Sequence, residues 1–505
     1  MSRSIVWLSA GVCALALAGS TPALADTLAD AIRLAYDTNP TLQAQRAQLR
    51  STDEVYVQAR AGYRPTISAT AQGFWQWQRI GKPSCTVFGC GDSSPETNQG
   101  SAVLNVTQPI YTGGRATAQV RTAEARVLAG REDLRRIEAQ VMLSVIQAYV
   151  DVRRDEQSLE IFRDNVKVLQ RQVDESRARF DVGEVTRTDV AQSEAQLAQS
   201  QSQLSSSQAQ LANSRAAYAT AVGQSPTKLE PEPVFKVFPE TVEQAFDTAE
   251  QNNPSIRSAD YSEQAAAAQV REARAQGAPE VSLQGSYGAA QPLHPFDTGA
   301  YTRTATAGVV ITQPLFSGGI TASQTRQAIE LQNVARIQVE QSRRVTDQNV
   351  SQSWNQLLAA RANITADEEQ VRAARIAFEG TRAEQQVGLR TTLEVLNAQQ
   401  VLETAELSLI AARHDEYLAA AEVLDVMGLL EAKNLVEGLD VQPGGHSFNQ
   451  LKHTYGYVGV LEEGVQALDS VGAAGHIEKT PPPVDRPIST APADSRPAPA
   501  TPDGS

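Results

Sequence analysis

Two similar stretches organise this chain: TQPIYTGGR at Thr107–Arg115 and TQPLFSGGI at Thr312–Ile320. The second begins 205 positions after the first and repeats it with an aliphatic residue, an aromatic residue and a Gly-Gly pair at matching places. The repetition indicates that the protein builds one structural part twice.

The match continues on both sides of these stretches. TLADAIRLAYDTNP aligns with TVEQAFDTAEQNNP 214 positions later, and the same spacing places Pro65 on Pro279. The first copy then carries nine extra residues, after which the spacing stays at 205. A period this long is not that of a solenoid repeat, so we interpret it as an internal duplication. The predicted copies are residues 26–238 and 239–437.

Both ends of the chain are expected to lie outside the repeats. Arg3, an apolar run and a small-x-small site at Ala23–Ala25 predict that residues 1–25 are a secretory signal peptide. At the other end, the last 25 residues contain eight prolines. Residues 438–505 are therefore expected to form a Pro-rich, largely disordered tail.

Each copy contains two stretches in which apolar and polar residues alternate. This period of two predicts strands at about 66–80 and 99–111 in the first copy and at about 280–290 and 300–316 in the second. A soluble sheet with one buried face and a membrane barrel both fit the pattern. Strand length and the tryptophans Trp75 and Trp77 near a strand end favour the barrel. Four strands cannot close a membrane barrel, which needs about eight, so the chain is expected to oligomerise.

A long polar helical stretch without proline follows each Gly-Gly pair. Helices over 114–183 and 319–388 would each be about 100 Å long. A second helix is expected to return from each, giving long hairpins at 114–223 and 319–431. Apolar residues recur every seven positions on the first return helix, which predicts coiled-coil contacts along a narrow stripe. A tunnel wall and an ordinary solvated coiled coil both remain compatible with these helices.

Only two cysteines follow the signal peptide. Cys85 and Cys90 lie in CTVFGC, within the interval where the first copy is longer. An exported protein meets an oxidising compartment, so a local disulfide is expected, with two free thiols as the alternative.

The composition excludes several classes of function. The net charge is −14 and the basic residues are dispersed, which argues against a nucleic-acid partner. The sequence has no phosphate-binding glycine loop, no G-x-S-x-G motif and no zinc motif, and its five histidines lack metal-ligand spacing. We therefore expect neither an enzyme nor a bound cofactor or metal.

From Asp26 to Glu437 the chain resembles the TolC-type outer membrane efflux protein family. The resemblance rests on the paired Asn-Pro breaks, the two Gly-Gly junctions and the turns VGEVTRTDV and VGLRTTLEV. It implies an α+β membrane protein of the outer membrane, a homotrimer whose 12-stranded barrel continues into a periplasmic α-helical tunnel.

The resemblance also implies partners. These are a periplasmic adaptor and an inner-membrane transporter, either ABC-type or proton-driven, which pass proteins (type I secretion) or small molecules to the exit duct. The alternative is a periplasmic coiled-coil adaptor, which would have one hairpin within a soluble β domain.

The resemblance places candidate site residues at the tunnel tip. The adaptor-contact turns are Val182, Gly183, Val387 and Gly388. The candidate gate residues are Asp189 and Arg390 as latch residues, Glu394 and Asn397 at two positions that are acidic rings in the family, and Gln385 in place of a latch tyrosine.

A second interpretation of two gate residues stays open. TRTD at Thr186–Asp189 and TTLE at Thr391–Glu394 have the spacing of capping boxes that begin the return helices. Three-fold assembly would bring three Glu394 carboxylates towards one axis, where their mutual repulsion is expected to raise some pKa values.

Overall fold

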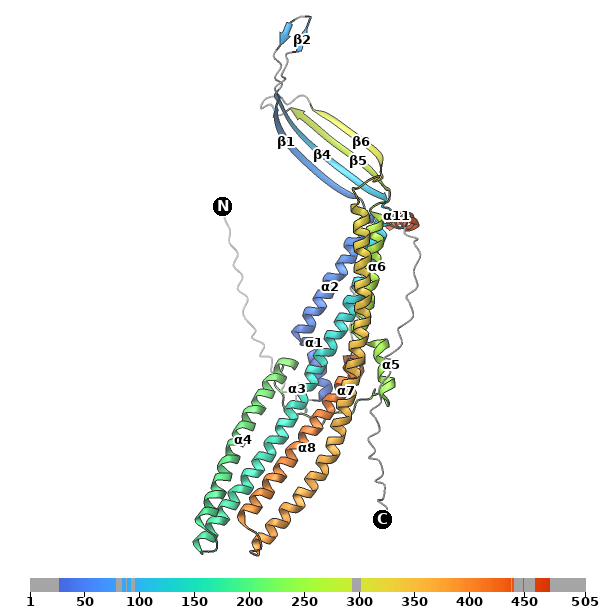
Figure 1. Cartoon of the computed structure of the whole chain (residues 1–505). Helices are drawn as coiled ribbons and strands as arrows, with labels where there is room; N and C mark the ends of the chain where they lie inside the picture. Colours follow the sequence, from blue (N-terminus) through green and yellow to red (C-terminus); the bar gives the residue numbers. More distant parts are fainter. Residues whose placement is uncertain are drawn as a thin grey trace, which may run out of the picture.

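The computed structural model is an elongated molecule with a sheet towards one end and two helical hairpins reaching to the other (Figure 1). It describes residues 27–78, 84–87, 89–91, 96–292, 301–436, 438–439, 448 and 459–472. The expected signal peptide, residues 1–25, lies outside the described residues.

The two copies produce the same order of elements. The first gives α1 (Leu28–Thr38), α2 (Pro40–Arg60), η1 (Ala61–Tyr63), β1 (Thr66–Trp77), β4 (Glu96–Tyr111), α3 (Arg115–Asp181) and α4 (Arg187–Val222). The second gives α5 (Val242–Asn252), α6 (Pro254–Ala275), β5 (Glu280–Pro292), β6 (Thr302–Thr312), α7 (Ile320–Gln386) and α8 (Thr392–Val426). The short strands β2 (Ser84–Thr86) and β3 (Gly89–Gly91) occupy the interval in which the first copy is longer. The short helix α9 (Ala432–Leu435) ends the second copy, and α11 (Gly459–Gly472) follows it.

An asparagine ends the first helix of each copy and caps the second. The side-chain oxygens of Asn39 and Asn253 accept hydrogen bonds from the first amides of α2 and α6, each of which begins with proline. The side-chain amide of Asn39 donates to the Ala221 carbonyl at 3.2 Å, and that of Asn253 donates to the Val426 carbonyl at 2.7 Å. Each helix break is thereby tied to the end of the return helix of its own copy.

The Gly-Gly pairs are the points where strand becomes helix. Gly113 and Gly114 have φ values of 69° and 86°, and Gly318 and Gly319 have 62° and 84°. Side chains other than glycine rarely adopt this left-handed region. At Gly113 there is also no space, because a Cβ would lie 2.3 Å from the Cβ of Ala278 in the other copy. The junction therefore needs glycine for its backbone angle and, in the first copy, for its close contact as well.

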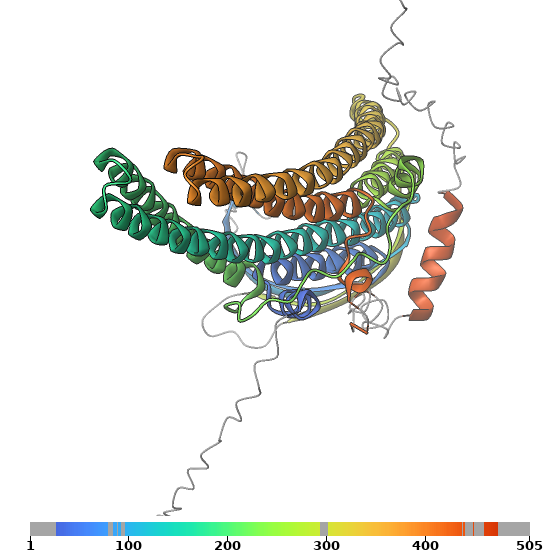
Figure 2. The ribbon, with the colours of Figure 1, turned by 90° about the horizontal axis from the view of Figure 1, so that it is seen from below.

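Two long hairpins extend from these junctions. Helices α3 and α7 each contain 67 residues, which corresponds to about 100 Å, and α4 and α8 return alongside them. The hairpins lie next to each other and curve together when seen from below (Figure 2). No helix in the described part of the chain is long and apolar enough to cross a membrane.

The four long strands form one antiparallel sheet in the order β1-β4-β5-β6. Its register collects the apolar members of each alternation on one face and the polar members on the other. One row across the sheet is Ala69, Leu104, Tyr287 and Ala305, and the next row is Ser68, Asn105, Ser286 and Thr306. Both β1 and β6 are exposed along their whole length, including Ile67 and Val309 on the apolar face. This two-faced alternation is the pattern of a membrane barrel strand.

The two hairpins of the sheet have one register. Thr66 lies opposite Thr107 in the first hairpin, and Glu280 lies opposite Thr312 in the second. The spacing of 214 takes Thr66 to Glu280, and the spacing of 205 takes Thr107 to Thr312, so the first pair becomes the second. A third contact, β4 with β5, joins the two copies and leaves β1 and β6 as the outer edges of this sheet.

The Pro-rich segment that connects the copies packs across the middle of the molecule. Tyr149 on α3 is fully buried and donates a hydrogen bond to the Glu230 carbonyl at 2.7 Å. Tyr417 on α8 donates to the Pro233 carbonyl at 3.0 Å and stacks on Phe235. The connecting segment therefore touches one hairpin from each copy.

The expectation that residues 438–505 form a largely disordered tail misses an ordered helix, α11. Its Asp469 carboxylate is completely buried and accepts hydrogen bonds from the amides of Thr112 at 2.7 Å, Gly114 at 2.9 Å and Thr117 at 3.1 Å. Val465 packs into the core at the start of α3. The prediction applied the Pro-rich composition of the last 25 residues to the whole interval from 438 to 505. Helix α11 lies before those 25 residues, and its Asp469 carboxylate caps the positive end of the long helix α3.

Candidate functional site

The hairpins end in two similar turns at the end of the molecule opposite the sheet (Figure 1). Gly183 and Gly388 both have a φ of 80°, and a Cβ at either place would meet no other atom within 4 Å. Beside them Val182 is 71% exposed and Val387 is 70% exposed. The predicted adaptor-contact residues thus form two apolar tips in this chain.

Capping boxes begin both return helices, as the sequence predicted. The Thr186 hydroxyl accepts a hydrogen bond from the Asp189 amide, and the Asp189 carboxylate accepts one from the Thr186 amide at 2.8 Å. Thr391 and Glu394 make the same pair of bonds at the start of α8, with 2.8 Å between the Thr391 nitrogen and the carboxylate. Asp189 and Glu394 therefore have a structural role in addition to any role at a gate.

Arg390 connects the two sides of the second turn. Its guanidinium donates to Glu384 at 2.8 Å and to Glu394 at 2.8 Å. The Thr391 amide and the Arg390 guanidinium lower the pKa of Glu394 to about 2. Within one chain this is opposite to the raised pKa values expected for a ring of carboxylates. Repulsion in such a ring would have to act against these local partners.

The other candidate gate residues lie apart from this ion pair. Gln385 is buried and its side-chain amide donates to the Thr392 hydroxyl at 3.4 Å. Asn397 is exposed on α8. In the part of the chain that the structure describes, no hydrogen bond or ion pair joins Asp189 to Arg390, so the two predicted latch residues are not in contact.

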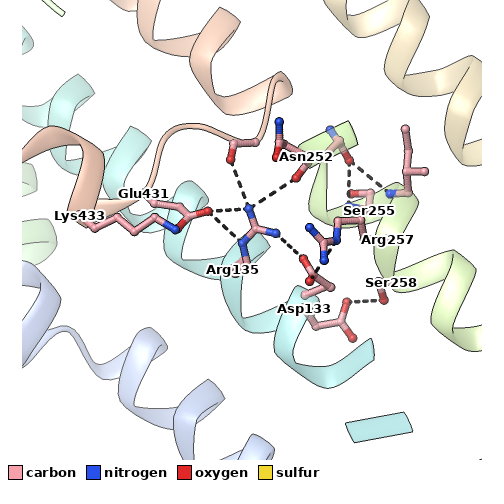
Figure 3. Close-up of polar contacts among 12 residues, drawn as sticks. Asp133, Arg135, Asn252, Ser255, Arg257, Ser258, Glu431 and Lys433 are labelled. Carbon is pink, nitrogen blue, oxygen red and sulfur yellow. Dashed lines mark hydrogen bonds and ion pairs between the residues drawn. The ribbon is translucent and has the colours of Figure 1, made fainter. Parts of the chain in front are cut away.

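A second polar site, not predicted from the sequence, lies where α3 of the first copy meets residues of the second copy (Figure 3). Arg135 on α3 donates two hydrogen bonds to Glu431, at 2.6 and 2.9 Å, and one to Glu132 at 2.6 Å. It also donates to the carbonyls of Asn252 and Gly428, both at 3.5 Å. Arg135 thereby joins the first copy to both the beginning and the end of the second.

Repeat comparison gives no signal for this site. The position that corresponds to Arg135 in the second copy is Glu340, whose carboxylate makes a surface pair with Arg344. Glu431, the main partner of Arg135, follows the end of α8 and lies outside the regular helix pattern. The contact arises only when α3 packs beside the break between α5 and α6.

An open groove of about 550 Å³ is lined by residues of α3, α7 and α8 halfway down the hairpins. Apolar residues such as Ile161, Phe378 and Leu409 line it together with charged residues of all three helices. Within the described ranges, no three His, Cys, Asp or Glu side chains are grouped closely enough to bind a metal ion.

A sheet with one apolar and one polar face, joined through two glycine junctions to helices about 100 Å long, defines a channel-forming protein of the outer membrane. A family model described as "Outer membrane efflux protein" matches residues 31–224 and 245–429. The chain belongs to this family. It is an outer-membrane protein whose helical part lies in the periplasm, and its family consists of channels rather than enzymes.

Individual relatives agree with this assignment. The outer membrane efflux protein BepC of Brucella suis is 34% identical over 419 residues, which cover 83% of this chain and 88% of BepC. TolC of Vibrio cholerae is 26% identical over 426 residues, covering 83% and 94% of the two chains. AprF of Pseudomonas aeruginosa, an alkaline protease secretion protein, is 25% identical over 443 residues, covering 86% and 90%.

Solved structures have the same fold. The CmeC outer membrane channel of Campylobacter jejuni superposes with a TM-score of 0.71 at 14% identity, covering 84% of this chain and 89% of CmeC. The outer-membrane channel OprN superposes with a TM-score of 0.69 at 19% identity, covering 79% and 89%.

Proposed function

We propose that this protein is the outer-membrane exit duct of a tripartite export system, fed by an inner-membrane transporter through a periplasmic adaptor. The observation that carries the proposal is the continuity of each sheet hairpin with a long helical hairpin, which occurs twice in one chain. A periplasmic adaptor, the alternative, would need only one hairpin in a soluble β domain. The names of BepC and AprF include efflux and protease secretion, so the relatives point to both small-molecule and protein cargo.

The contact between the two copies predicts how one chain meets the next. By the repeat spacings, β6 is the counterpart of β4, and β1 is the counterpart of β5. Since β4 pairs with β5 inside the chain, β6 is expected to pair with β1 of a neighbouring chain. A head-to-tail contact of this kind generates a ring when its rotation closes. Three chains, the number favoured by the family resemblance, would give a barrel of 12 strands.

Exposure on α7 supports the same arrangement. Ile337 on α7 is 67% exposed in the single chain, whereas its counterpart on α3, Glu132, is buried and pairs with Arg257 of α6. A neighbouring chain that repeats the contact between α3 and α6 would place its α2 against α7. The exposed apolar surface of α7 would then be covered by a second copy of this chain.

Cysteines at Ala71 and Ile311 are expected to form a disulfide between chains. Val106 lies opposite Gly285 in the contact between the copies, and the repeat spacings convert this pair to Ile311 and Ala71. Non-reducing electrophoresis of oxidised outer membranes should show species of two and three chains that disappear on reduction. Residues directly opposite on antiparallel strands have Cβ atoms only about 5 Å apart, which suits a disulfide.

The matched control combines Ala71→Cys with Ala305→Cys, which lies six residues out of this register on the same strand. It should cross-link far less, as should each single variant. A bond within one chain is excluded by geometry, because β1 and β6 lie at opposite edges of the sheet. Equal cross-linking of both pairs, or a monomer only, would contradict the proposed ring.

We propose that the two apolar tips contact the adaptor and that Glu394 lines a constriction there. The tips are exposed in this chain, and Glu394 lies six residues after the turn glycine at the beginning of α8. Within the turn Arg390 offsets one of the two carboxylates of Glu384 and Glu394. Each chain then contributes about one net negative charge, which would attract cations to a pore.

Glu394→Gln is expected to weaken cation selectivity and block by divalent cations from the periplasmic side. Glutamine keeps the shape and much of the cap, but it removes up to three charges from the proposed ring. Single-channel currents across a lipid bilayer in a salt gradient would measure both effects. Glu379→Gln removes one charge from an exposed position on α7 and serves as the control. If Glu394→Gln changed only the melting temperature, Glu394 would be a helix cap and the constriction would lie elsewhere.

The disulfide between Cys85 and Cys90 stays a prediction. The backbone register of β2 and β3 places the two residues directly opposite each other. Both strands lie beyond the sheet, at the end of the molecule farthest from the helical tips (Figure 1). In the proposed duct this end would face the cell exterior.

A further inference from the structure

Helices α3 and α8 meet along a seam between the two hairpins, and its lower part contains a buried polar cluster. Asn165 on α3 donates hydrogen bonds to Glu403 at 2.7 Å and to Ser200 at 3.3 Å, and it accepts one from Gln399 at 3.0 Å. Asn165, Glu403 and Gln399 are each at least nine-tenths buried. The cluster therefore joins the first hairpin to the second at the wall of the open groove, with its own side chains almost fully covered.

Two oxygen atoms of this cluster have no hydrogen-bond partner. They are Oε1 of Glu403 and Oε1 of Gln399, and both are buried. An ionised carboxylate and an amide oxygen can only accept, so neither can satisfy the other. Residues four apart on a helix face each other, so one proton on Glu403 could be donated to Gln399 and would satisfy both atoms. The unpaired acceptors thus fit a neutral Glu403 better than a charged one.

The same seam contains a second site that favours an added proton. His414 on α8 places Nε2 3.0 Å from a carboxylate oxygen of Asp151 on α3 and Nδ1 2.8 Å from one of Asp415. Carboxylates accept hydrogen bonds, and a neutral imidazole has only one N–H to donate. Only the imidazolium form can donate to both neighbours. The His414 side chain is 9% exposed, so water is a poor substitute for either partner.

We propose that the seam between α3 and α8 is a proton-dependent clasp, which Glu403 and His414 tighten when both are protonated. No ligand or partner chain is needed, because the donors and acceptors belong to the two hairpins themselves. The clasp goes beyond the proposed duct function and does not depend on it. In a duct built from these hairpins, acid would make the wall stiffer.

The charged neighbours of the two sites act in the same direction. Around Glu403, three carboxylates line the groove: Glu160 and Asp164 of α3 and Glu406 of α8. The two arginines that line it are already paired, Arg375 of α7 with Glu406 and Arg413 of α8 with Glu368. Ser200, the partner from α4, is uncharged. Around His414 lie Asp151 and Asp415 as acceptors and Arg154, which is itself paired with Asp151 and Asp155. Even with Lys167, which pairs with Asp164, carboxylates outnumber cations at both sites.

The directions of the pKa shifts agree with the geometry. Burial raises the pKa of Glu403, and the Glu406 carboxylate raises it further. Burial alone would lower the pKa of His414, but the hydrogen bonds to Asp151 and Asp415 outweigh this effect and raise it. A group whose pKa is raised in the folded state stabilises the seam fully at any pH below its ordinary pKa. This stabilisation is lost as the pH rises through the pKa of the folded state. The contribution of Glu403 should therefore be lost at a pH above about 4, and that of His414 at a pH above about 6.5, so the clasp loosens as the pH rises.

Hydrogen-exchange mass spectrometry of the full-length protein in lipid nanodiscs tests the clasp without requiring transport. After correction for the chemical exchange rate, peptides covering residues 395–415 should be more protected at about pH 5 than at about pH 8. Each group changes the opening equilibrium by up to tenfold for every unit by which its folded-state pKa exceeds the ordinary value. Peptides covering β5 and β6, far from the seam, provide an internal reference.

Two variants should separate the contributions of Glu403 and His414 to the pH dependence of exchange. Glu403→Gln copies the protonated side chain and should keep the seam protected at the higher pH, whereas Glu369→Gln, at an exposed position on α7 where the carboxylate pairs with Arg372, should behave like the wild type. His414→Gln should remove the part of the pH dependence near neutrality. Exchange that does not depend on pH in the wild type, or Glu403→Gln that exchanges like the wild type at the higher pH, would overturn the proposal. The wild-type profile tests it even if a variant folds poorly.

Discussion

Replacing Gly113 with alanine is expected to destabilise the protein by about 3 kcal/mol. A non-glycine residue at a positive φ costs about 1–2 kcal/mol, and forcing a methyl group into a packed contact costs about 1–3 kcal/mol more. Both costs apply here, since φ is 69° and a Cβ would lie 2.3 Å from that of Ala278. Gly113 and Ala278 belong to different copies, so the clash can be relieved only if the sheet-to-helix junction shifts. Thermal unfolding followed by circular dichroism in detergent would measure the loss.

Gly388→Ala is the matched control for this substitution. Gly388 has a φ of 80°, but a Cβ there would meet no atom within 4 Å. It should cost only the backbone term, about 1–2 kcal/mol. Equal effects at Gly113 and Gly388 would contradict the close contact with Ala278 and would assign the need for glycine to backbone angle alone.

Arg135→Met is expected to cost about 2 kcal/mol, because it removes the cation that two buried carboxylates share and leaves Glu132 with Arg257 alone and Glu431 with Lys433 alone. Glu431 and Glu132 are each about nine-tenths buried, and Arg135 is their shared partner. The carbonyls of Asn252 and Gly428 lose a donor as well. Because this site joins α3 to both ends of the second copy, the helical part should also lose cooperativity on unfolding. Chemical denaturation followed by circular dichroism would show both changes.

The adjacent residue supplies the control. Arg136 is about two-fifths exposed and its contact with Asp133 is 3.9 Å, so Arg136→Met should change stability by less than about 1 kcal/mol. Adding Glu431→Gln to Arg135→Met should recover part of the loss, since it removes a buried charge that keeps only Lys433 as a partner. Additive effects of these two substitutions would show that Arg135 and Glu431 do not act as a pair.

Local patterns were sufficient to predict much of the molecule. Alternation from Thr66 onwards and polar helical composition after Gly114 each depend on neighbours in sequence, so strand and long helix could be inferred before any packing was known. The capping boxes at Thr186 and Thr391 were predictable for the same reason, because a cap is completed within four residues. The role of Asp189 and Arg390 as latch residues depends on how the turns are placed in space, and it stays a prediction.

The amino-acid sequence by itself determined the duplication, the sheet hairpins, the glycine junctions and the family, because all of these are carried by order and spacing along the chain. The tertiary structure alone decided that Arg135 would join the copies, that Asp469 would cap a helix more than 350 positions earlier in the chain, and that Glu403 and His414 would lie on one seam. These properties depend on which side chains lose water and which donors they then meet. Burial of that kind is set by contacts between distant helices, and it leaves no periodic signal in the sequence.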